Sequence, residues 1–177
     1  MKNIYLIGMM GSGKTATGFA LSRILKIPFI DVDEMIVKRA GKTINNIFAD
    51  HDEVFFRGVE REVLASVAAR TDQVISTGGG IVLDPANQAV MKTTGTVIYL
   101  NTGLETLWKR VRARSDRPLL LTDDPKKTLE TIFLVRKTLY EQTADFVFLT
   151  DDNTPHGLAE EIVRTCFPPE THETNQS

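Results

Sequence analysis

The sequence predicts an α/β fold, a three-layer sandwich in which a five-stranded parallel sheet carries helices on both faces. Two observations lead to this prediction. Short apolar runs rich in Ile, Val, Phe and Tyr recur along the chain, and such near-continuous apolarity is typical of strands buried on both faces. Helical stretches separate the runs, so that right-handed crossovers would join parallel strands. The runs occupy residues 3–8, 28–31, 73–77, 96–100 and 146–150.

Helices are expected at 15–25 after the first run and at 33–40 and 52–70 after the second. In the last of these, Phe56, Val59, Val63 and Val67 fall on one helical face.

Helix start signals follow the later strands. Asp84-Pro85 and Asp124-Pro125 each join an N-cap to a first-turn proline, opening helices to about Lys92 and Thr143. We expect Thr102 to cap a helix over 103–114 in the same way, and a final helix over 155–167.

Two segments do not fit a core. Residues 115–124 (SDRPLLLTDD) are polar at both ends and interrupted by proline, which suggests a lid-like insertion between two helices. Residues 168–177 are polar and begin with proline, and we expect a disordered tail there. The remaining chain, 1–167, is predicted to be one domain.

Composition limits the class of protein. The chain has 177 residues and a net charge of −2, which argues against a nucleic-acid-binding or membrane-bound protein. The single cysteine, Cys166, fits a reducing compartment, and the first apolar run is too short to be a membrane span or a signal peptide. We therefore expect a cytoplasmic protein.

The segment GMMGSGKT (8–15) matches the phosphate-binding pattern G-x-x-x-x-G-K-[ST] between a strand and a helix. Gly8, Gly11 and Gly13 let the backbone turn tightly and direct N–H groups at phosphate oxygens, and the positive helix N-terminus adds to the attraction. In this pattern Lys14 reaches the β- and γ-phosphates and the Thr15 hydroxyl binds Mg²⁺. The sequence therefore predicts a nucleotide-binding protein.

Other motifs narrow the kind of nucleotide protein. The D-x-x-G and N-K-x-D patterns of guanine-nucleotide switches do not occur. The run 73–77 ends in Ser76-Thr77 rather than in the acidic residue usual in large ATPases, so the metal-facing carboxylate must come from elsewhere. Asp31 is the best-placed candidate. If 28–33 is extended, Asp31 and Asp33 project to the same side of its end. A short chain with a lid suggests a small-molecule kinase.

The combined motifs resemble shikimate kinase, a phosphate-loop kinase, over about residues 3–145. The resemblance rests on GMMGSGKT, D-V-D (31–33), F-R-G-V-E (56–60), S-T-G-G-G (76–80), R-P-L-L (117–120) and R-K-T-L-Y (136–140).

The resemblance implies transfer of the γ-phosphate of ATP to the 3-hydroxyl of shikimate, with one Mg²⁺ ion held by Thr15 and Asp31. Lys14, Asp33 and Arg117 would be catalytic, with Arg117 arriving on the lid. The implied nucleotide-binding residues are Gly11, Ser12, Gly13, Lys14, Thr15, Ala16, Arg110 and Arg117. ATP and shikimate would be the partners of a monomeric enzyme, with no nucleic acid or membrane.

The implied shikimate-binding residues are Asp33, Arg57, Gly78, Gly79, Gly80 and Arg136. Arg57 and Arg136 would bind the carboxylate, because a fixed guanidinium offers a forked pair of donors. Glu60 would hold Arg57 in place. From spacing alone, the plainer interpretation of Arg57 and Glu60 is an exposed i,i+3 ion pair. For Arg136, the plainer interpretation is a position on the solvated face of a long helix.

One segment departs from the family pattern. Where the family commonly has an arginine beside adenine, this chain has TDDNTP (150–155). Adenine contacts there would come from the backbone, Asn153 or Thr154, and the nucleobase preference stays open. Two alternatives to the shikimate assignment also remain: a kinase of another hydroxy-acid such as gluconate, and a nucleotide-sensing module without catalysis.

Overall fold

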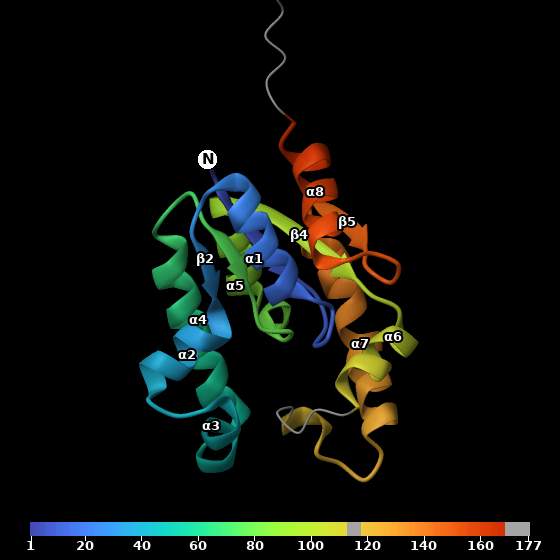
Figure 1. The fold of residues 1–177 in the computed structure, drawn as a ribbon. Coiled ribbons are helices and arrows are strands. Elements are labelled where there is room, and N and C mark those ends of the chain that lie inside the picture. Colours follow the sequence, from blue (N-terminus) through green and yellow to red (C-terminus); the bar gives the residue numbers. More distant parts are fainter. Residues whose placement is uncertain (113–117, 169–177) are drawn as a thin grey trace, which may run out of the picture.

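The computed structural model describes residues 1–112 and 118–168. Its five strands form one parallel sheet in the order β2-β3-β1-β4-β5, and helices cover both faces (Figure 1), which confirms the predicted fold class. The strands are β1 (Asn3–Ile7), β2 (Phe29–Asp31), β3 (Val74–Ser76), β4 (Gly95–Asn101) and β5 (Phe146–Leu149).

The helices follow the predicted order with one addition. The α-helices are α1 (Lys14–Leu25), α2 (Val32–Ala40), α3 (Ile44–Asp50), α4 (Glu53–Ala68), α5 (Pro85–Thr94), α6 (Leu104–Val111), α7 (Pro125–Thr143) and α8 (Pro155–Cys166). Short 3₁₀ turns occur at η1 (Ile81–Leu83) and η2 (Pro118–Leu120). The prediction missed α3, whose seven residues are too few for a clear apolar period. Thr43 caps it by accepting the N–H of Asn46 at 3.2 Å.

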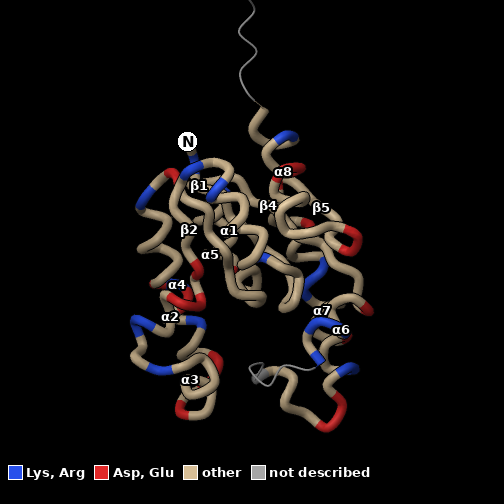
Figure 2. The backbone as a smooth tube through the Cα atoms, in the orientation of Figure 1, with Lys and Arg blue, Asp and Glu red and all other residues tan. Residues whose placement is uncertain are grey.

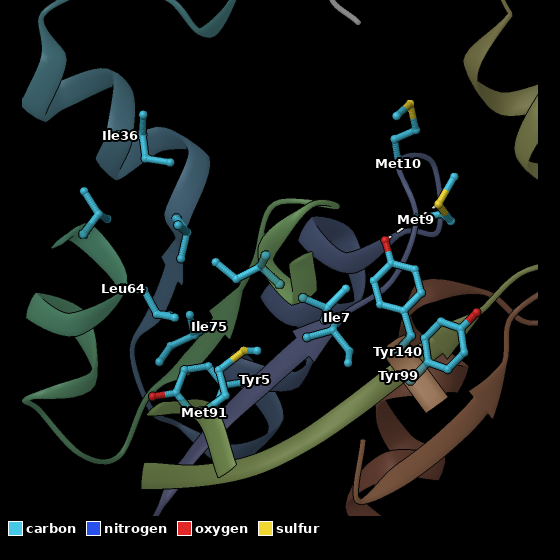
Figure 3. Packing of buried hydrophobic residues seen from close by; sticks show 14 of the residues in the cluster. Tyr5, Ile7, Met9, Met10, Ile36, Leu64, Ile75, Met91, Tyr99 and Tyr140 are labelled. Atoms are coloured by element: carbon cyan, nitrogen blue, oxygen red, sulfur yellow. Dashed lines mark hydrogen bonds between the residues drawn. The ribbon is translucent and has the colours of Figure 1, made fainter. Parts of the chain in front are cut away.

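The central strand β1 divides the core. All five of its residues are fully buried, and alternate side chains enter different clusters. Ile4 and Leu6 pack with residues of α1 and α8, whereas Tyr5 and Ile7 pack on the other face with residues of α4, α5 and α7. Figure 3 shows Tyr5 and Ile7 in the second cluster. A strand buried on both faces explains the continuous apolar run that the sequence shows.

Two predicted helix caps are confirmed and one is wrong. Asp84 and Asp124 each accept a backbone N–H of the first turn of α5 and α7. Asp52, for which no cap was predicted, does the same for α4. Thr102, however, does not cap α6: its hydroxyl pairs with the hydroxyl of Thr150. A carboxylate from a distant segment takes the role, because Asp151 accepts the Gly103 N–H at 3.0 Å.

Acidic and basic residues are interspersed over the described helices (Figure 2), in keeping with the small net charge. Within residues 1–112 and 118–168, no helix combines the length and apolarity required to cross a bilayer.

Candidate active site

The phosphate-binding loop joins β1 to α1 as predicted. Gly8, Gly11 and Gly13 have φ angles of 147°, 81° and 90°, a region that favours glycine. Space is also limited: a Cβ on Gly8 would lie 2.7 Å from the carbonyl oxygen of Leu100. The buried Lys14 Nζ donates to the carbonyl oxygens of Gly8 and Met9, both at 2.9 Å, so its charge sits at the loop. Thr15 and Ala16 are exposed and line a cleft beside this loop, the phosphate cleft. Its lining residues are Met10, Gly11, Gly13, Lys14, Thr15, Ala16, Asp31, Asp33, Ser76, Thr77, Gly79 and Arg110.

The two predicted metal-binding residues lie together. Thr15 Oγ1 donates to Asp31 Oδ2 at 2.9 Å. Asp31 ends β2 and also caps α2, because its Oδ1 accepts the N–H groups of Asp33 at 3.0 Å and Glu34 at 3.4 Å. These bonds fix the carboxylate with one oxygen directed at Thr15. A hydroxyl beside a carboxylate, at the mouth of a phosphate loop, is the hard oxygen pair that Mg²⁺ prefers.

Asp33 reaches the cleft, but not by the predicted route. β2 ends at Asp31, and Asp33 lies in the first turn of α2 rather than on an extended strand. Strand alternation therefore does not place it. The capping bond from its own N–H to Asp31 fixes the helix start instead. Asp33 still lines the phosphate cleft together with Asp31. Its predicted place in the cleft is therefore confirmed, but the strand alternation from which it was predicted is wrong.

A second cavity adjoins the phosphate cleft and is lined by all six predicted acceptor residues. Apolar side chains of α3, α4 and η2 form part of its wall, and four charged side chains enter it. The lining residues are Met10, Asp33, Ile44, Phe48, Phe56, Arg57, Glu60, Gly78, Gly79, Gly80, Leu119 and Arg136. The phosphate cleft and this acceptor pocket share Met10, Asp33 and Gly79.

Arg57 and Glu60 form a buried pair on α4. Their side chains are 16% and 0% exposed, and Arg57 Nη1 lies 2.7 Å from Glu60 Oε2. A second acid, Glu53, binds the same guanidinium at 3.0 Å. Burial raises the pKa of Glu60, with a further increase from Asp33, while the charges of Arg57 and Arg136 act in the opposite direction. The pair is therefore not the ordinary exposed ion pair that spacing alone suggested.

Charged side chains pack closely against two of the three glycines. Gly78, Gly79 and Gly80 all have negative φ, so their backbone angles alone do not demand glycine. A Cβ on Gly80 would lie 2.3 Å from Arg57 Nη2, and one on Gly78 would lie 2.9 Å from Asp33 Oδ1. The absence of side chains thus lets the charged groups of the pocket close over this loop.

Arg136 lies on α7 and is only 5% exposed. The alternative of a solvated helix face is therefore wrong for this residue, although its neighbours Lys126, Lys127 and Lys137 are exposed. Within the described chain, Arg136 forms no ion pair with a carboxylate. A buried guanidinium without such a partner is well suited to bind an anionic ligand.

The nucleobase end is formed by α6 and the loop before α8. Arg110 donates to the carbonyl oxygens of Gly11 at 3.1 Å and Thr150 at 3.5 Å. A cavity here is lined by Gly11, Ser12, Gly13, Thr17, Arg110, Thr150, Asn153, Pro155 and Leu158.

Of the two predicted adenine contacts, Asn153 lines this cavity. The Thr154 hydroxyl instead accepts the Gly157 N–H at 3.1 Å and caps α8. Arg117 lies outside the described residues, as do positions 115 and 116 of the proposed lid and residues 169–177 of the expected tail. These predictions stay open.

The apolar wall of the acceptor pocket and the place of Tyr140 were not predicted from the sequence. Ile44 and Phe48 belong to helix α3, which was not predicted, so no sequence pattern indicated that they line the pocket. Tyr140 ends the R-K-T-L-Y motif but received no role. Its position one turn after Arg136 could have indicated that it lies near the pocket.

The fold and site define a phosphotransferase of the phosphate-loop small-molecule kinase class. A family model described as shikimate kinase matches residues 10–167. The chain belongs to the shikimate kinase family, and it is an ATP-dependent kinase.

Individual relatives agree with this assignment. A shikimate kinase of Hahella chejuensis is 42% identical over 93% of this chain and 85% of its own length, and one of Legionella pneumophila is 40% identical over 94% and 95%. The solved structure of a shikimate kinase from Acinetobacter baumannii in complex with shikimate is 35% identical, with a TM-score of 0.90 over 93% of this chain and 92% of that one.

Proposed function

We propose that the protein transfers the γ-phosphate of ATP to the 3-hydroxyl of shikimate, giving shikimate 3-phosphate and ADP in aromatic amino-acid biosynthesis. One observation carries the proposal: the phosphate cleft and the acceptor pocket meet at Met10, Asp33 and Gly79. An acceptor in the pocket would therefore face the end of a triphosphate in the cleft, which is what in-line transfer needs.

The chemistry of the pocket suits a small hydroxy-acid with a ring. Arg57 and Arg136 supply two guanidinium groups for one carboxylate. Phe48 and Phe56 provide apolar wall that a ring can cover. Asp33, on the side shared with the phosphate cleft, would accept a hydrogen bond from the attacking hydroxyl. The ligand is thereby held at both ends.

In the transfer step, the hydroxyl oxygen of the acceptor forms a bond to the γ-phosphorus as the bond to the β,γ-bridging oxygen breaks. ADP leaves with that oxygen, and Asp33 takes the hydroxyl proton. Because the transition state is loose, positioning and charge neutralisation account for most of the catalysis. Lys14 provides positive charge at the loop, and we infer from the family resemblance that Arg117 adds more from the lid.

Thr15 and Asp31 would hold one Mg²⁺ ion that enters with ATP. The described residues contain no group of three or more His, Cys, Asp or Glu side chains suited to a metal, so phosphate oxygens and water would complete the coordination. When bound, the ion neutralises charge on the phosphates.

A coupled assay of ADP release separates the three candidate functions. We expect ADP release that depends on shikimate and is at least a hundredfold slower with gluconate. Faster release with gluconate would favour the other hydroxy-acid kinase. Tight ATP binding without release in the presence of any hydroxy-acid would favour the sensing module, although such a module has no need for the acceptor arginines.

We further propose that the enzyme acts as a monomer, as the family resemblance implies, and in the cytoplasm, as the composition of the sequence suggests. Light scattering after size-exclusion chromatography should give a mass near the 19.7 kDa of one chain. A mass twice as large would contradict the monomer.

A further inference from the structure

Tyr140 connects α7 to both loops of the active site. Its hydroxyl donates a hydrogen bond to the carbonyl oxygen of Gly79, in the glycine loop of the acceptor pocket. The same hydroxyl lies 3.7 Å from Sδ of Met9, in the phosphate-binding loop, the contact marked by the dashed line in Figure 3. The side chain is fully buried. One group of α7 therefore contacts the two segments between which transfer would occur.

Gly79 is enclosed by these same segments. A Cβ at this position would lie 3.4 Å from the Met10 nitrogen and 3.5 Å from Arg136 Nη1. Arg136 precedes Tyr140 by one helical turn, so both side chains of α7 approach Gly79 together. Burial raises the pKa of Tyr140 far above its usual range, whereas the charge of Arg136 and a hydrogen bond with it act in the opposite direction. The hydroxyl therefore stays protonated and remains a donor.

The bond to Gly79 also orients the next amide. The described chain has no cis peptide, and in a planar trans peptide the C=O and N–H groups point in opposite directions. When the Gly79 carbonyl is held against Tyr140, the Gly80 N–H must point away from that hydroxyl. Within residues 1–112 and 118–168, this N–H has no hydrogen-bond acceptor, and Gly80 lines the acceptor pocket.

We propose that the Tyr140 hydroxyl is a positioning residue for the acceptor: it holds the peptide between Gly79 and Gly80 so that the Gly80 N–H is available to a hydroxyl of the bound acid. The inference rests on the proposed function, because it assumes that the acid occupies this pocket. Tyr140 touches no substrate itself and acts through the glycine loop.

The alternative is a buried tyrosine that only stabilises the core, and the chain offers a matched control for it. Tyr99 stacks on Tyr140 with ring centroids 5.0 Å apart and is equally buried. Its hydroxyl donates to Asn101 Oδ1 at 3.2 Å, and among the described residues it forms no hydrogen bond with either loop. Tyr140→Phe and Tyr99→Phe therefore each remove one buried hydroxyl from the same ring pair.

The test compares the steady-state kinetics and melting temperatures of both variants. Tyr140→Phe should raise the KM for shikimate about fivefold to tenfold and lower kcat, as expected for loss of one positioned hydrogen bond, with the KM for ATP changed less than twofold. Tyr99→Phe should leave all three constants within about twofold, with a similar change in melting temperature. Equal kinetics in the two variants would overturn the proposal. No turnover of shikimate by the wild type would instead refute the proposed function.

A second measurement does not depend on the folding of a variant. In wild-type protein with isotope-labelled glycine, the Gly80 amide resonance should shift when shikimate is added, and in Tyr140→Phe the shift should be smaller. If shikimate binds the wild type and the Gly80 resonance does not move, the proposal is wrong.

Discussion

Asp31 and Asp33 stand two positions apart in the chain but enter the cleft from different elements. Asp31 faces Thr15, whereas Asp33 lies in both cavities. Asp31→Asn should therefore raise the Mg²⁺ concentration needed for half-maximal rate, with partial rescue by excess metal, because an amide binds a hard cation less well. Asp33→Asn should lower kcat with shikimate at least a hundredfold and resist rescue by metal.

Mg²⁺ titrations of both variants at saturating ATP distinguish these roles. If the two respond to metal alike, the division is wrong and the carboxylates act as one metal site.

The burial of Arg136 favours a role in ligand binding over a position on a solvated helix face. Arg136→Lys keeps the charge but replaces a forked donor by a point charge. We expect the KM for shikimate to rise about tenfold, with a smaller change in the KM for ATP. Lys137→Arg, at the adjacent exposed position, is the control and should change neither constant. An unchanged KM for shikimate in Arg136→Lys would remove Arg136 from the acceptor site.

At the scale of the elements, substitutions in the glycine loop should affect substrate binding more than the stability of the fold. A Cβ on Gly80 would meet the flexible end of Arg57, which can move, whereas one on Gly95 in β4 would lie 2.4 Å from the Asn3 carbonyl oxygen, which cannot. Gly80→Ala should therefore raise the KM for shikimate severalfold with little loss of stability. Gly95→Ala should cost about 2 kcal/mol, or roughly 4–8 °C in melting temperature. The opposite pattern would contradict the packing described for this loop.

Helix α6 depends on a cap from outside its own sequence. Hydrogen bonds from Thr106 and from the Gly103 N–H lower the pKa of Asp151. A lowered carboxylate pKa stabilises the fold above the unfolded pKa of about 4, and this contribution is lost as the pH falls through the folded value. Asp151→Ala should cost at most about 1 kcal/mol at pH 7, since the site is exposed.

The difference between wild type and Asp151→Ala should begin to shrink below about pH 4 and should be lost as the pH falls through the lowered pKa of the folded protein. Denaturant unfolding at pH 7 and pH 3 measures it, and Asp151→Asn, which keeps an acceptor oxygen without charge, should be destabilised less at pH 7. An equal cost of Asp151→Ala at both pH values would show that the charge is not responsible. Because α6 carries Arg110, Asp151→Ala should also raise the KM for ATP.

The helix caps differ in how far they could be predicted from the sequence. Asp84 and Asp124 cap the helices that directly follow them, so local chemistry predicted both. The cap of α6 comes from a residue 48 positions away from Gly103. The position of Asp33 was argued from an extended chain beyond Asp31, but the capping bonds of Asp31 start a helix there instead. Sequence patterns therefore predicted the caps that precede a proline, but they missed the local cap at Asp31 and the cap of α6, which comes from a distant segment.

At the scale of the whole molecule, the parallel sheet accounts for the meeting of the two cavities. Parallel strands bring their carboxyl ends to one edge, so that the loop after β1, the end of β2 and the glycines after β3 lie together. The order of apolar runs and the phosphate-loop motif predicted this arrangement. The pocket walls from α3 and the link from Tyr140 to Gly79 could not be predicted, because they depend on packing between segments distant in the chain.

The most direct test of the account is to identify the product formed from ATP and shikimate. Phosphorus and proton NMR of a completed reaction should show one equivalent of ADP and one of shikimate phosphorylated only at the 3-hydroxyl, because Asp33 and the two arginines would hold the ring in one orientation. Phosphate on another hydroxyl, or ADP released without phosphorylated shikimate, would contradict the proposed arrangement of the site.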